Sequence, residues 1–340
     1  DENYLDSRKK IHVEPTGNSL KFVVPNLNPF DAINMIANKS LPEKSKGAGY
    51  FFYETTGGFY FRSWQSMITN QGEFARPYKQ NFYSQPAKIS DVAESRDEKT
   101  GQVQDKVLRE YQTVEQYQFV NNFHDVAANT ALGTYGHRVI SHNLFDKSYD
   151  IADYNYHNEF GKTPHTDTLK YTTQYAIMNS PVDYDNKDGV SSYAESRVSL
   201  QTTTPFLHDK DVGKYGLEPL QDGLKTGQRV SQSNQVTQGT ALRLLVKGQS
   251  YLEAGHLIEF NLKDVNSADT QNNSDPRFSG NYIITKIRHQ VTGDSYKMVL
   301  ECAKDSVATS YGDLGDGYNG ADAGFAMNIH TANRSELELE

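Results

Sequence analysis

The chain has 340 residues, of which 36% are hydrophobic, and carries a formal net charge of −9 at pH 7. This length is typical of about two domains, and the low mean hydropathy of −0.71 favours an oligomer whose neighbouring chains complete part of the core. The charge argues against a binder of nucleic-acid backbones, which normally carries a basic surface. No apolar run is long enough for a transmembrane helix, and a single cysteine, Cys302, excludes an intrachain disulfide.

The best-specified part of the chain runs from residue 21 to residue 67 and predicts a strand, a capped helix and a β-hairpin. Asn28 is a good helix N-cap, and Pro29 suits the first helical position because its missing N–H costs nothing there. Aromatic-rich strands over 49–54 and 59–63 flank Thr-Thr-Gly-Gly, a strong hairpin signal. Nothing in this unit has a catalytic pattern.

The rest of the chain is assigned from alternation and helical spacing. We expect a loop over 69–86 and a strand giving way to a helix over 107–127, while 228–238 can be helical. The other expected strands are 11–14, 20–24, 132–145, 240–247, 256–262, 280–290 and 295–303. The last four of these predict a small antiparallel barrel or sandwich.

Two regions are polar. The stretch 147–227 is rich in turn residues, and we interpret it as an insertion outside the core domain, with strands or a short helix only at 171–178 and 198–203. After residue 303 the chain is rich in Gly, Asp, Ala and Ser, which is typical of a tail that becomes ordered against a partner.

Ten histidines invite a metal site, but HExxH is absent and one cysteine excludes CxxC. His137 and His142 fall in one expected strand, where alternation places them on opposite faces. His157 and His165, with Glu159, form the remaining candidate ligand set, on a polar loop. Because these residues lie on a loop, they are a weak candidate for a metal site. The sequence predicts no metal and no cofactor.

Motifs for other chemistry are absent or incomplete in the sequence. The run from Asp183 resembles a calcium loop but supplies Lys187, Asp188 and Ala194 where an EF-hand needs an oxygen ligand, a glycine and an acid. GxSxG and P-loop motifs are absent. Paired carboxylates for glycosidase chemistry stay open, because any Asp and Glu can meet in a fold. No pair is singled out by its surroundings, so the sequence predicts no catalytic residue.

Four segments in this order resemble the central baseplate hub subunit of contractile-tailed, T-even-like bacteriophages. They are VPNLNPFDAINMIANKS…GYFFYETTGGFYFRSWQSM (24–67), YQFVNNFHDVAANTALGTYGHRVISHNLFDKSYD (117–150), GQRVSQSNQVTQGTALRLLVKGQSYLEAGHLIEFNL (227–262) and NYIITKIRHQVTGDSYKMVLECAKDS (281–306). The resemblance is collinear over most of the chain. It implies a β-rich α+β fold with a tail-tube-like antiparallel β-barrel domain and an α+β domain that carries the polar insertion.

The resemblance also implies a division of the chain. Subunits of the family carry two such barrels, and we expect the first to be missing N-terminal to residue 1. The implied parts are 11–86 with 149–227 as the outer α+β domain and insertion, 87–148 with 228–303 as the barrel domain, and 304–340 as a flexible tail.

The implied function is structural and non-enzymatic. A homotrimeric ring would join the tail tube above to the spike trimer below, contact other baseplate proteins, adapt threefold to sixfold symmetry, and let DNA pass without specific binding. We expect the protein in the tail baseplate of a virion assembled in the host cytoplasm. The tail 304–340 is expected to contact the spike or a neighbouring chain. Expected subunit contacts are Phe59, Tyr60, Phe61, Arg62, Leu242, Leu244, Tyr282, Ile284 and Met298.

Two alternatives from other classes remain open. One is a phage-borne cell-wall hydrolase, which a muralytic assay would reveal. The other is a receptor- or glycan-binding tail module, for which the Tyr-rich stretch 149–193 is the obvious surface.

Overall fold

The computed structural model describes residues 7–17, 24–43, 47–69, 80–84, 111–119, 126–143, 147, 149–160, 162–167, 190–203, 218–238, 240–263, 274–275 and 278–306. Most of the expected strand 20–24, the expected element 171–178, the run from Asp183 and the tail after residue 306 lie outside the described residues. Within the described part, the chain is a sheet-rich α+β protein with three sheets and few helices.

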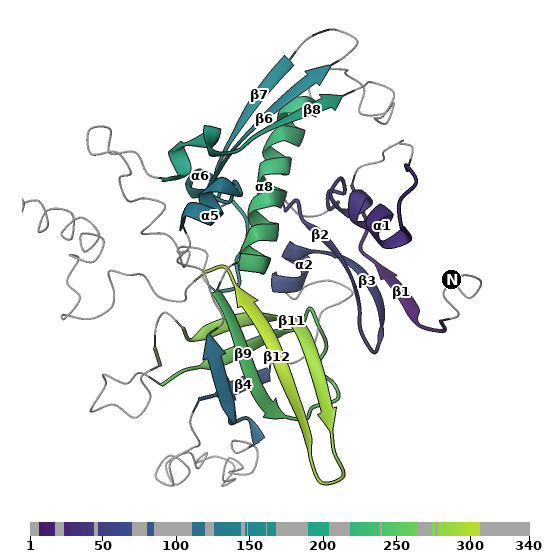
Figure 1. Cartoon of the computed structure of the whole chain (residues 1–340), viewed down its shortest axis with the longest axis vertical. Coiled ribbons are helices and arrows are strands. Elements are labelled where there is room, and N and C mark those ends of the chain that lie inside the picture. The colour runs from purple at the N-terminus through teal and green to yellow at the C-terminus, as the bar shows by residue number, and fades with distance from the viewer. Residues whose placement is uncertain are drawn as a thin grey trace, which may run out of the picture.

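The largest sheet curves into a small barrel (Figure 1). Its six strands lie in the order β4 (Gln80–Tyr83), β10 (Leu257–Asn261), β11 (Gly280–Val291), β12 (Tyr296–Lys304), β9 (Thr240–Lys247) and β5 (Gln116–Phe119). The two edges meet where Tyr83 forms a parallel bridge with Thr113, just before β5. At the same place the backbone N–H of Val114 donates a hydrogen bond of 2.9 Å to the carbonyl of Tyr83.

Apolar side chains from the strands fill the barrel interior, as alternation predicts. The buried cluster includes Phe82, Val114, Leu242, Leu244, Ile258, Tyr282, Ile284, Met298, Leu300 and Cys302. The four C-terminal strands are confirmed to within one residue at each end. Two features correct the expected antiparallel barrel: β4 lies in a stretch expected to be a loop, and it pairs with β10 in parallel.

A second sheet has the order β7 (Tyr149–Asn155), β6 (Gly136–Asn143) and β8 (Val198–Thr203). The long helix α8 (Glu218–Gln238) packs along one face of it, against β6 and β7 (Figure 1). Two glycines allow this approach, because an added Cβ at Gly223 would lie 2.6 Å from Ala152 and one at Gly227 only 2.5 Å from Tyr154. Glycine weakens a helix interior by about 1 kcal/mol relative to alanine, so these two positions serve packing.

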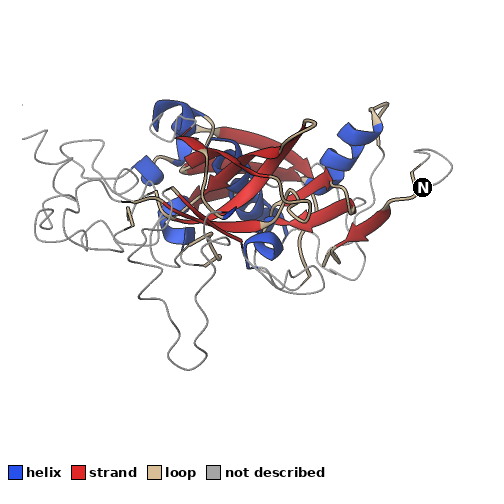
Figure 2. Ribbon diagram, turned by 90° about the horizontal axis from the view of Figure 1, so that it is seen from below, coloured by secondary structure: helices blue, strands red, loops and turns tan. Residues whose placement is uncertain are grey.

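The third sheet has the order β1 (Lys10–Val13), β3 (Gly58–Ser63) and β2 (Tyr50–Glu54). Against β2 lies α1 (Pro29–Ala37), and the Asn28 side chain accepts the N–H of Phe30 at 3.3 Å, which confirms the expected N-cap. Directly after β3, α2 (Trp64–Thr69) packs Trp64 against Ile283 and Ala303 of the barrel. Seen from below, strands occupy much of the middle of the molecule (Figure 2).

These pairings cross the division of the chain that the resemblance implies. Residues 80–83, expected in the outer domain, form a barrel strand, and residues 136–143, expected in the barrel domain, form the centre of the second sheet. The expected insertion 149–227 supplies β7, β8 and part of α8 to that sheet and its helix. Alternation identifies a strand but does not name a partner far away in the sequence, so the assignment of strands to sheets could not be read from it.

The remaining described elements are short. They are α5 (Val126–Ala131), α6 (Tyr156–Phe160) and the 3₁₀ turns η1 (Val190–Ser192) and η2 (Ala194–Ser196). None of the helices in the described ranges is long and apolar enough to cross a membrane.

Candidate functional site

Alternation divides the side chains of the β7–β6–β8 sheet into two faces. The face toward α8 carries the buried residues Val139, Ala152 and Tyr154. His137 lies on the same face, fully buried, with Nε2 2.6 Å from the hydroxyl of Ser199. Burial, and secondarily the charge of Arg197, lowers the pKa of His137 to about 4. This histidine is therefore a neutral core residue near pH 7.

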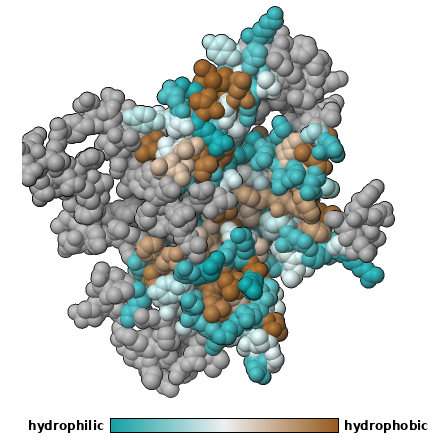
Figure 3. All heavy atoms as spheres, viewed as in Figure 1, coloured by the Kyte–Doolittle hydropathy of each residue, from teal (hydrophilic) through white to brown (hydrophobic). Residues whose placement is uncertain are grey.

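The opposite face of the same sheet is apolar and reaches the surface. The pairing registers place Ile140 beside Ile151 and beside Leu200, and the exposed fractions are 68% for Tyr149, 47% for Ile151, 52% for Val198 and 70% for Leu200. We call these five residues the outer-sheet face. Figure 3 shows hydrophobic residues gathered over this part of the molecule. Contiguous exposed apolar surface on one element is typical of an interaction site.

An ion-pair cluster lies at one end of the outer-sheet face. The guanidinium of Arg138 is 2.7 Å from a carboxylate oxygen of Asp153 and 2.7 Å from one of Glu195. Its hydrogen bonds lower the pKa of Asp153, although partial burial acts in the opposite direction. With one cation and two carboxylates, this end of the face is negatively charged.

A second exposed apolar surface lies on the β1–β3–β2 sheet. Val13 pairs with Phe61, and Phe61 pairs with Phe52, so their side chains share one face, to which Ile11 also belongs. Phe30 of α1 lies over this face, with its ring centroid 6.1 Å from that of Phe52. Ile11, Val13 and Phe30 are exposed. We call Ile11, Val13, Phe30, Phe52 and Phe61 the N-terminal face.

The segment 162–167 ties α6 to the end of the barrel through buried polar groups. Nδ1 of His165 lies 2.7 Å from a carboxylate oxygen of Asp305, and Nε2 lies 2.8 Å from the carbonyl of Phe160. Both neighbours are hydrogen-bond acceptors, so both ring nitrogens of His165 are engaged. Burial alone would raise the pKa of Asp305, but His165 and the hydrogen bonds from Thr166 lower it. The result is a buried, charge-assisted contact.

A second buried ion pair supports the same segment. Nζ of Lys304 lies 3.3 Å from Asp167 and donates to the carbonyl of Ser279 at 2.9 Å. Asp167 also accepts the backbone N–H of Asn281 at 2.6 Å. Both side chains of the pair are almost fully buried, and desolvation lowers the pKa of Lys304 and raises that of Asp167. We call residues 165–167 with 304–305 the barrel-end junction.

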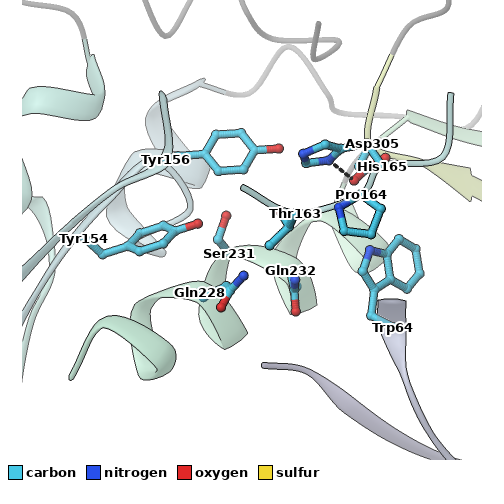
Figure 4. A pocket seen from close by; sticks show the side chains of 10 residues that line it. All are labelled: Trp64, Tyr154, Tyr156, Thr163, Pro164, His165, Gln228, Ser231, Gln232 and Asp305. Atoms are coloured by element: carbon cyan, nitrogen blue, oxygen red, sulfur yellow. Dashed lines mark hydrogen bonds and ion pairs between the residues drawn. The ribbon is translucent and has the colours of Figure 1, made fainter. Parts of the chain in front are cut away.

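A small pocket lies beside the barrel-end junction, between α8, the β7–α6 connection and Trp64 (Figure 4). Its interior has room for about one water molecule, so it is far smaller than the roughly 300–1,000 Å³ of pockets that bind ligands. Burial, then the charge of Asp305, raises the pKa of Tyr156 on its wall well above the ordinary value. The phenol is therefore neutral, and the lining suits a small polar molecule such as water.

The sequence-predicted contact residues in β3 divide between the two sides of their sheet. Phe59 and Phe61 point to the side of the N-terminal face, with Phe59 buried and Phe61 partly exposed. Tyr60 and Arg62 point to the other side and are buried. Tyr60 stacks on Tyr53, with 5.4 Å between ring centroids.

The other five predicted contact residues lie inside the barrel. Leu242, Leu244, Tyr282, Ile284 and Met298 are between 0% and 1% exposed and belong to one buried cluster. Their side chains therefore pack within the subunit, because a strand of a closed barrel turns alternate residues inward. Contacts between subunits made by these strands would use the alternate, outward residues.

Two of the candidate metal ligands, His165 and Glu159, are described, and both are engaged by other partners. His165 has both ring nitrogens engaged by the barrel-end junction, and Glu159 pairs with Lys162 at 2.6 Å. The side chain of His157 lies outside the described residues. Among the side chains that the structure does describe, no group of three or more His, Cys, Asp or Glu is placed to hold a metal ion. Cys302 is buried in the barrel, which raises its pKa and leaves it a thiol.

Sequence reasoning missed the outer-sheet face and the barrel-end junction. A signal for the first was the alternation Tyr149, Ile151, Asp153 within a stretch taken as turns. A signal for the second was Lys304-Asp305, two charges directly after the apolar strand 295–303. The partner of Lys304, Asp167, lies 137 positions away in the chain.

Comparisons with known proteins give distant structural likenesses alone. No family model matches the chain, and no curated protein matches it. The structure is similar to that of a tail protein from Neisseria meningitidis MC58, with a TM-score of 0.40 and 10% sequence identity over 88% of this chain and 62% of that one. It is also similar to the 43 kDa tail protein of prophage MuSo2 from Shewanella oneidensis, with a TM-score of 0.36 and 10% identity over 87% and 59%.

The chain thus spans about three fifths of the length of both tail proteins. Scores of 0.40 and 0.36 are too low to carry an argument about this chain. What this chain offers is its own exposed surfaces and its resemblance in sequence.

Proposed function

We propose that this chain is a structural subunit of a bacteriophage tail, and specifically a baseplate central hub subunit that forms a trimeric ring. The observation that carries the proposal is the outer-sheet face, an apolar sheet surface left exposed although the opposite surface of the same sheet is covered by α8. Such a face costs free energy in water and is covered when a partner binds. A subunit with an exposed apolar face is therefore suited to assembly with other chains.

The sequence resemblance supplies the particular role. The ring would join the tail tube above to the central spike trimer below and contact other baseplate proteins, in the tail of a virion. Three copies of a subunit with two tube-like barrels would adapt threefold to sixfold symmetry. The net charge of −9 suits a channel through which DNA moves without binding.

At the surface, one pair of carboxylates lacks the pattern that the hydrolase alternative requires. Asp153 and Glu195 share Arg138, and the hydrogen bonds from Arg138 lower the pKa of Asp153. A glycosidase needs one carboxyl group that stays protonated near neutral pH. We therefore propose a non-enzymatic role, and expect no lysis in a muralytic assay with the purified chain.

Co-expression with the spike and tail-tube proteins of the same virus tests the proposal. We expect one complex that contains equal numbers of this chain and the spike chain, and measure it by native mass spectrometry. Elution of this chain apart from both proteins, at concentrations where the spike trimer is intact, would contradict the hub role. A glycan array on the same sample would then test the receptor-binding alternative.

A further inference from the structure

The outer half of β11 forms an open edge of the barrel sheet. Its neighbour β10 pairs with it only between Gly280 and Ile283, whereas β12 pairs with it as far as Val291. The hairpin of β11 and β12 extends from the barrel at the bottom of Figure 1. On the side away from β12, residues 286–291 therefore meet no other strand of the part of the chain that the structure describes.

The hydrogen-bond register shows which backbone groups face this edge. The N–H of Thr292 donates to the carbonyl of Ser295 at 2.8 Å and closes the hairpin. Hydrogen-bonded and non-hydrogen-bonded pairs alternate along antiparallel strands, so the N–H and C=O groups of Ile287, His289 and Val291 point away from β12. A row of such groups is a template for one further strand.

Side chains along this edge alternate between two faces. Lys286 and Arg288 are exposed on the outer surface of the barrel. Lys286 lies 3.2 Å from Glu301, whereas Arg288 forms no ion pair with any described residue. The opposite face carries Ile287, which packs against the barrel core, and the exposed ring of His289. A strand added here would need acidic side chains on one face and apolar side chains on the other.

The C-terminal residues of this chain have that alternation. Residues 336–340 read Glu-Leu-Glu-Leu-Glu, so an extended backbone places three carboxylates on one face and two leucines on the other. With Glu338 beside Arg288, a further glutamate lies beside Lys286 and one leucine lies beside Ile287, in either strand direction. Opposite charges and apolar side chains that face each other across two strands both stabilise a sheet.

We propose that residues 336–340 pair with residues 286–290 of the same chain and add a strand to the barrel sheet. The chain is long enough, because 30 positions separate Ser306 from Glu336 and can span up to about 100 Å. The nine residues of β12 extend only about 30 Å. Attachment to the same polypeptide also raises the concentration of the segment at this edge. The contact does not depend on the proposed hub.

Amide hydrogen exchange, followed by NMR on the intact 340-residue chain, tests this contact. We expect the amides of Ile287 and His289 to be protected, and to exchange several-fold faster in a variant that ends at residue 335. Exchange in β9, measured in the same samples, is the control for folding. Unchanged exchange of the two amides in the shortened variant would overturn the proposal.

Charge reversals test the pairing of Glu338 with Arg288. Glu338→Lys and Arg288→Glu should each speed the exchange of the same two amides, because each variant places like charges side by side. The double variant should restore slow exchange. Asp322→Lys is the matched control, since it makes the same change of charge in the sequence before residue 336. Failure of the double variant to restore protection would overturn this pairing.

Dilution tests whether the segment comes from the same chain. Protection that is equal at all protein concentrations is expected when both strands belong to one chain. Protection that is lost on dilution would show that the segment comes from another copy, and would overturn the intrachain contact. The hub is tested separately by its complex with the spike, so failure of the edge contact leaves the hub proposal standing.

Discussion

The barrel and the outer sheet are built from the same alternating pattern of apolar residues. The two regions differ in whether those residues are buried within the chain. In the barrel, Leu244, Leu300 and their neighbours turn inward onto one another, and the seam at Tyr83 closes the sheet. In the β7–β6–β8 sheet, one set of alternate residues packs on α8 while Ile151 and Leu200 remain exposed. A closed sheet completes its own core, whereas an open sheet covered on one side keeps a surface for a partner.

Polar groups divide between the two regions in the same way. The barrel end buries the pair of Lys304 and Asp167, while the outer sheet carries Arg138 and its carboxylates near the surface. Buried charges cost several kcal/mol if one partner is lost, and exposed pairs contribute little. The barrel end should therefore be sensitive to mutation and the outer face tolerant.

The largest expected effect is a difference in unfolding free energy between variants of these two ion pairs. Lys304→Met would leave the Asp167 carboxylate buried without its cation, and we expect a loss of about 3–5 kcal/mol in the free energy of unfolding. Arg138→Met, the matched change on the outer sheet, should cost much less, because this ion pair lies at the surface. Urea unfolding of both variants measures the difference. Equal losses of unfolding free energy in the two variants would show that the barrel end is no more sensitive to mutation than the outer sheet.

Two leucine variants, one in each region, test the same comparison for apolar side chains. Leu244→Ala leaves a cavity in the closed barrel and should lower the free energy of unfolding by about 2–5 kcal/mol. Leu200→Ala removes the same atoms from an exposed face, and for the isolated subunit we expect a change within about 0.5 kcal/mol. Urea unfolding at low protein concentration measures both. A large loss at Leu200 would show that the outer face is already covered within the chain.

Acidic pH should lower the stability of the folded chain through His137, which lies on the face of the outer sheet that α8 covers. The pKa of His137 is about 4 in the folded chain because of its burial, below the unfolded value of about 6.5. Because the folded pKa is depressed, unfolding takes up a proton as the pH falls from 6.5 to 4, and stability should fall by up to about 3 kcal/mol over that window.

The variant His137→Gln should remove that part of the pH dependence, as measured by urea unfolding between pH 4 and 7. His142→Gln is the control, since His142 lies on the same strand but five residues on, toward the opposite face. An unchanged pH profile in His137→Gln would show that the pKa of His137 does not differ between the folded and the unfolded chain.

The smallest expected effect concerns how the N-terminal sheet is held to the barrel. Glu253 accepts hydrogen bonds from the hydroxyl of Thr56 at 2.7 Å and from the backbone N–H of Gly57 at 2.9 Å. Glu253→Ala should destabilise this attachment by about 1 kcal/mol, which corresponds to about five-fold faster hydrogen exchange in the β2–β3 turn. Glu253→Gln keeps an acceptor and should exchange at an intermediate rate. Unchanged exchange in Glu253→Ala would show that other contacts hold the turn.

Local signals predicted much of the fold. The cap at Asn28, the hairpin around Gly58 and the strands 240–247, 280–290 and 295–303 follow from neighbouring residues, and the structure contains them. β4 was missed because Gln-Asn-Phe-Tyr has little apolar periodicity and becomes a strand through its parallel partner β10. The length of α8 was missed because Gly223 and Gly227 lower helix propensity, and their use is visible only against β7.

The candidate site was harder to predict than the fold. Strand assignment alone does not say which of two alternate sets faces inward, and this is why Leu242, Leu244 and Tyr282 were expected at a subunit surface. The outer-sheet face depends on α8 covering one side of β6 and β7, a contact between segments far apart in the chain. No local pattern contains that information.

The most direct measurement is the mass of the wild-type chain in solution, by light scattering over a range of concentrations. We expect a trimer of the 38.3 kDa chain, stable on dilution because the apolar faces are covered in the assembly. A monomer at every concentration would contradict the proposed ring, since both exposed faces would then be without a partner in the species that should form it.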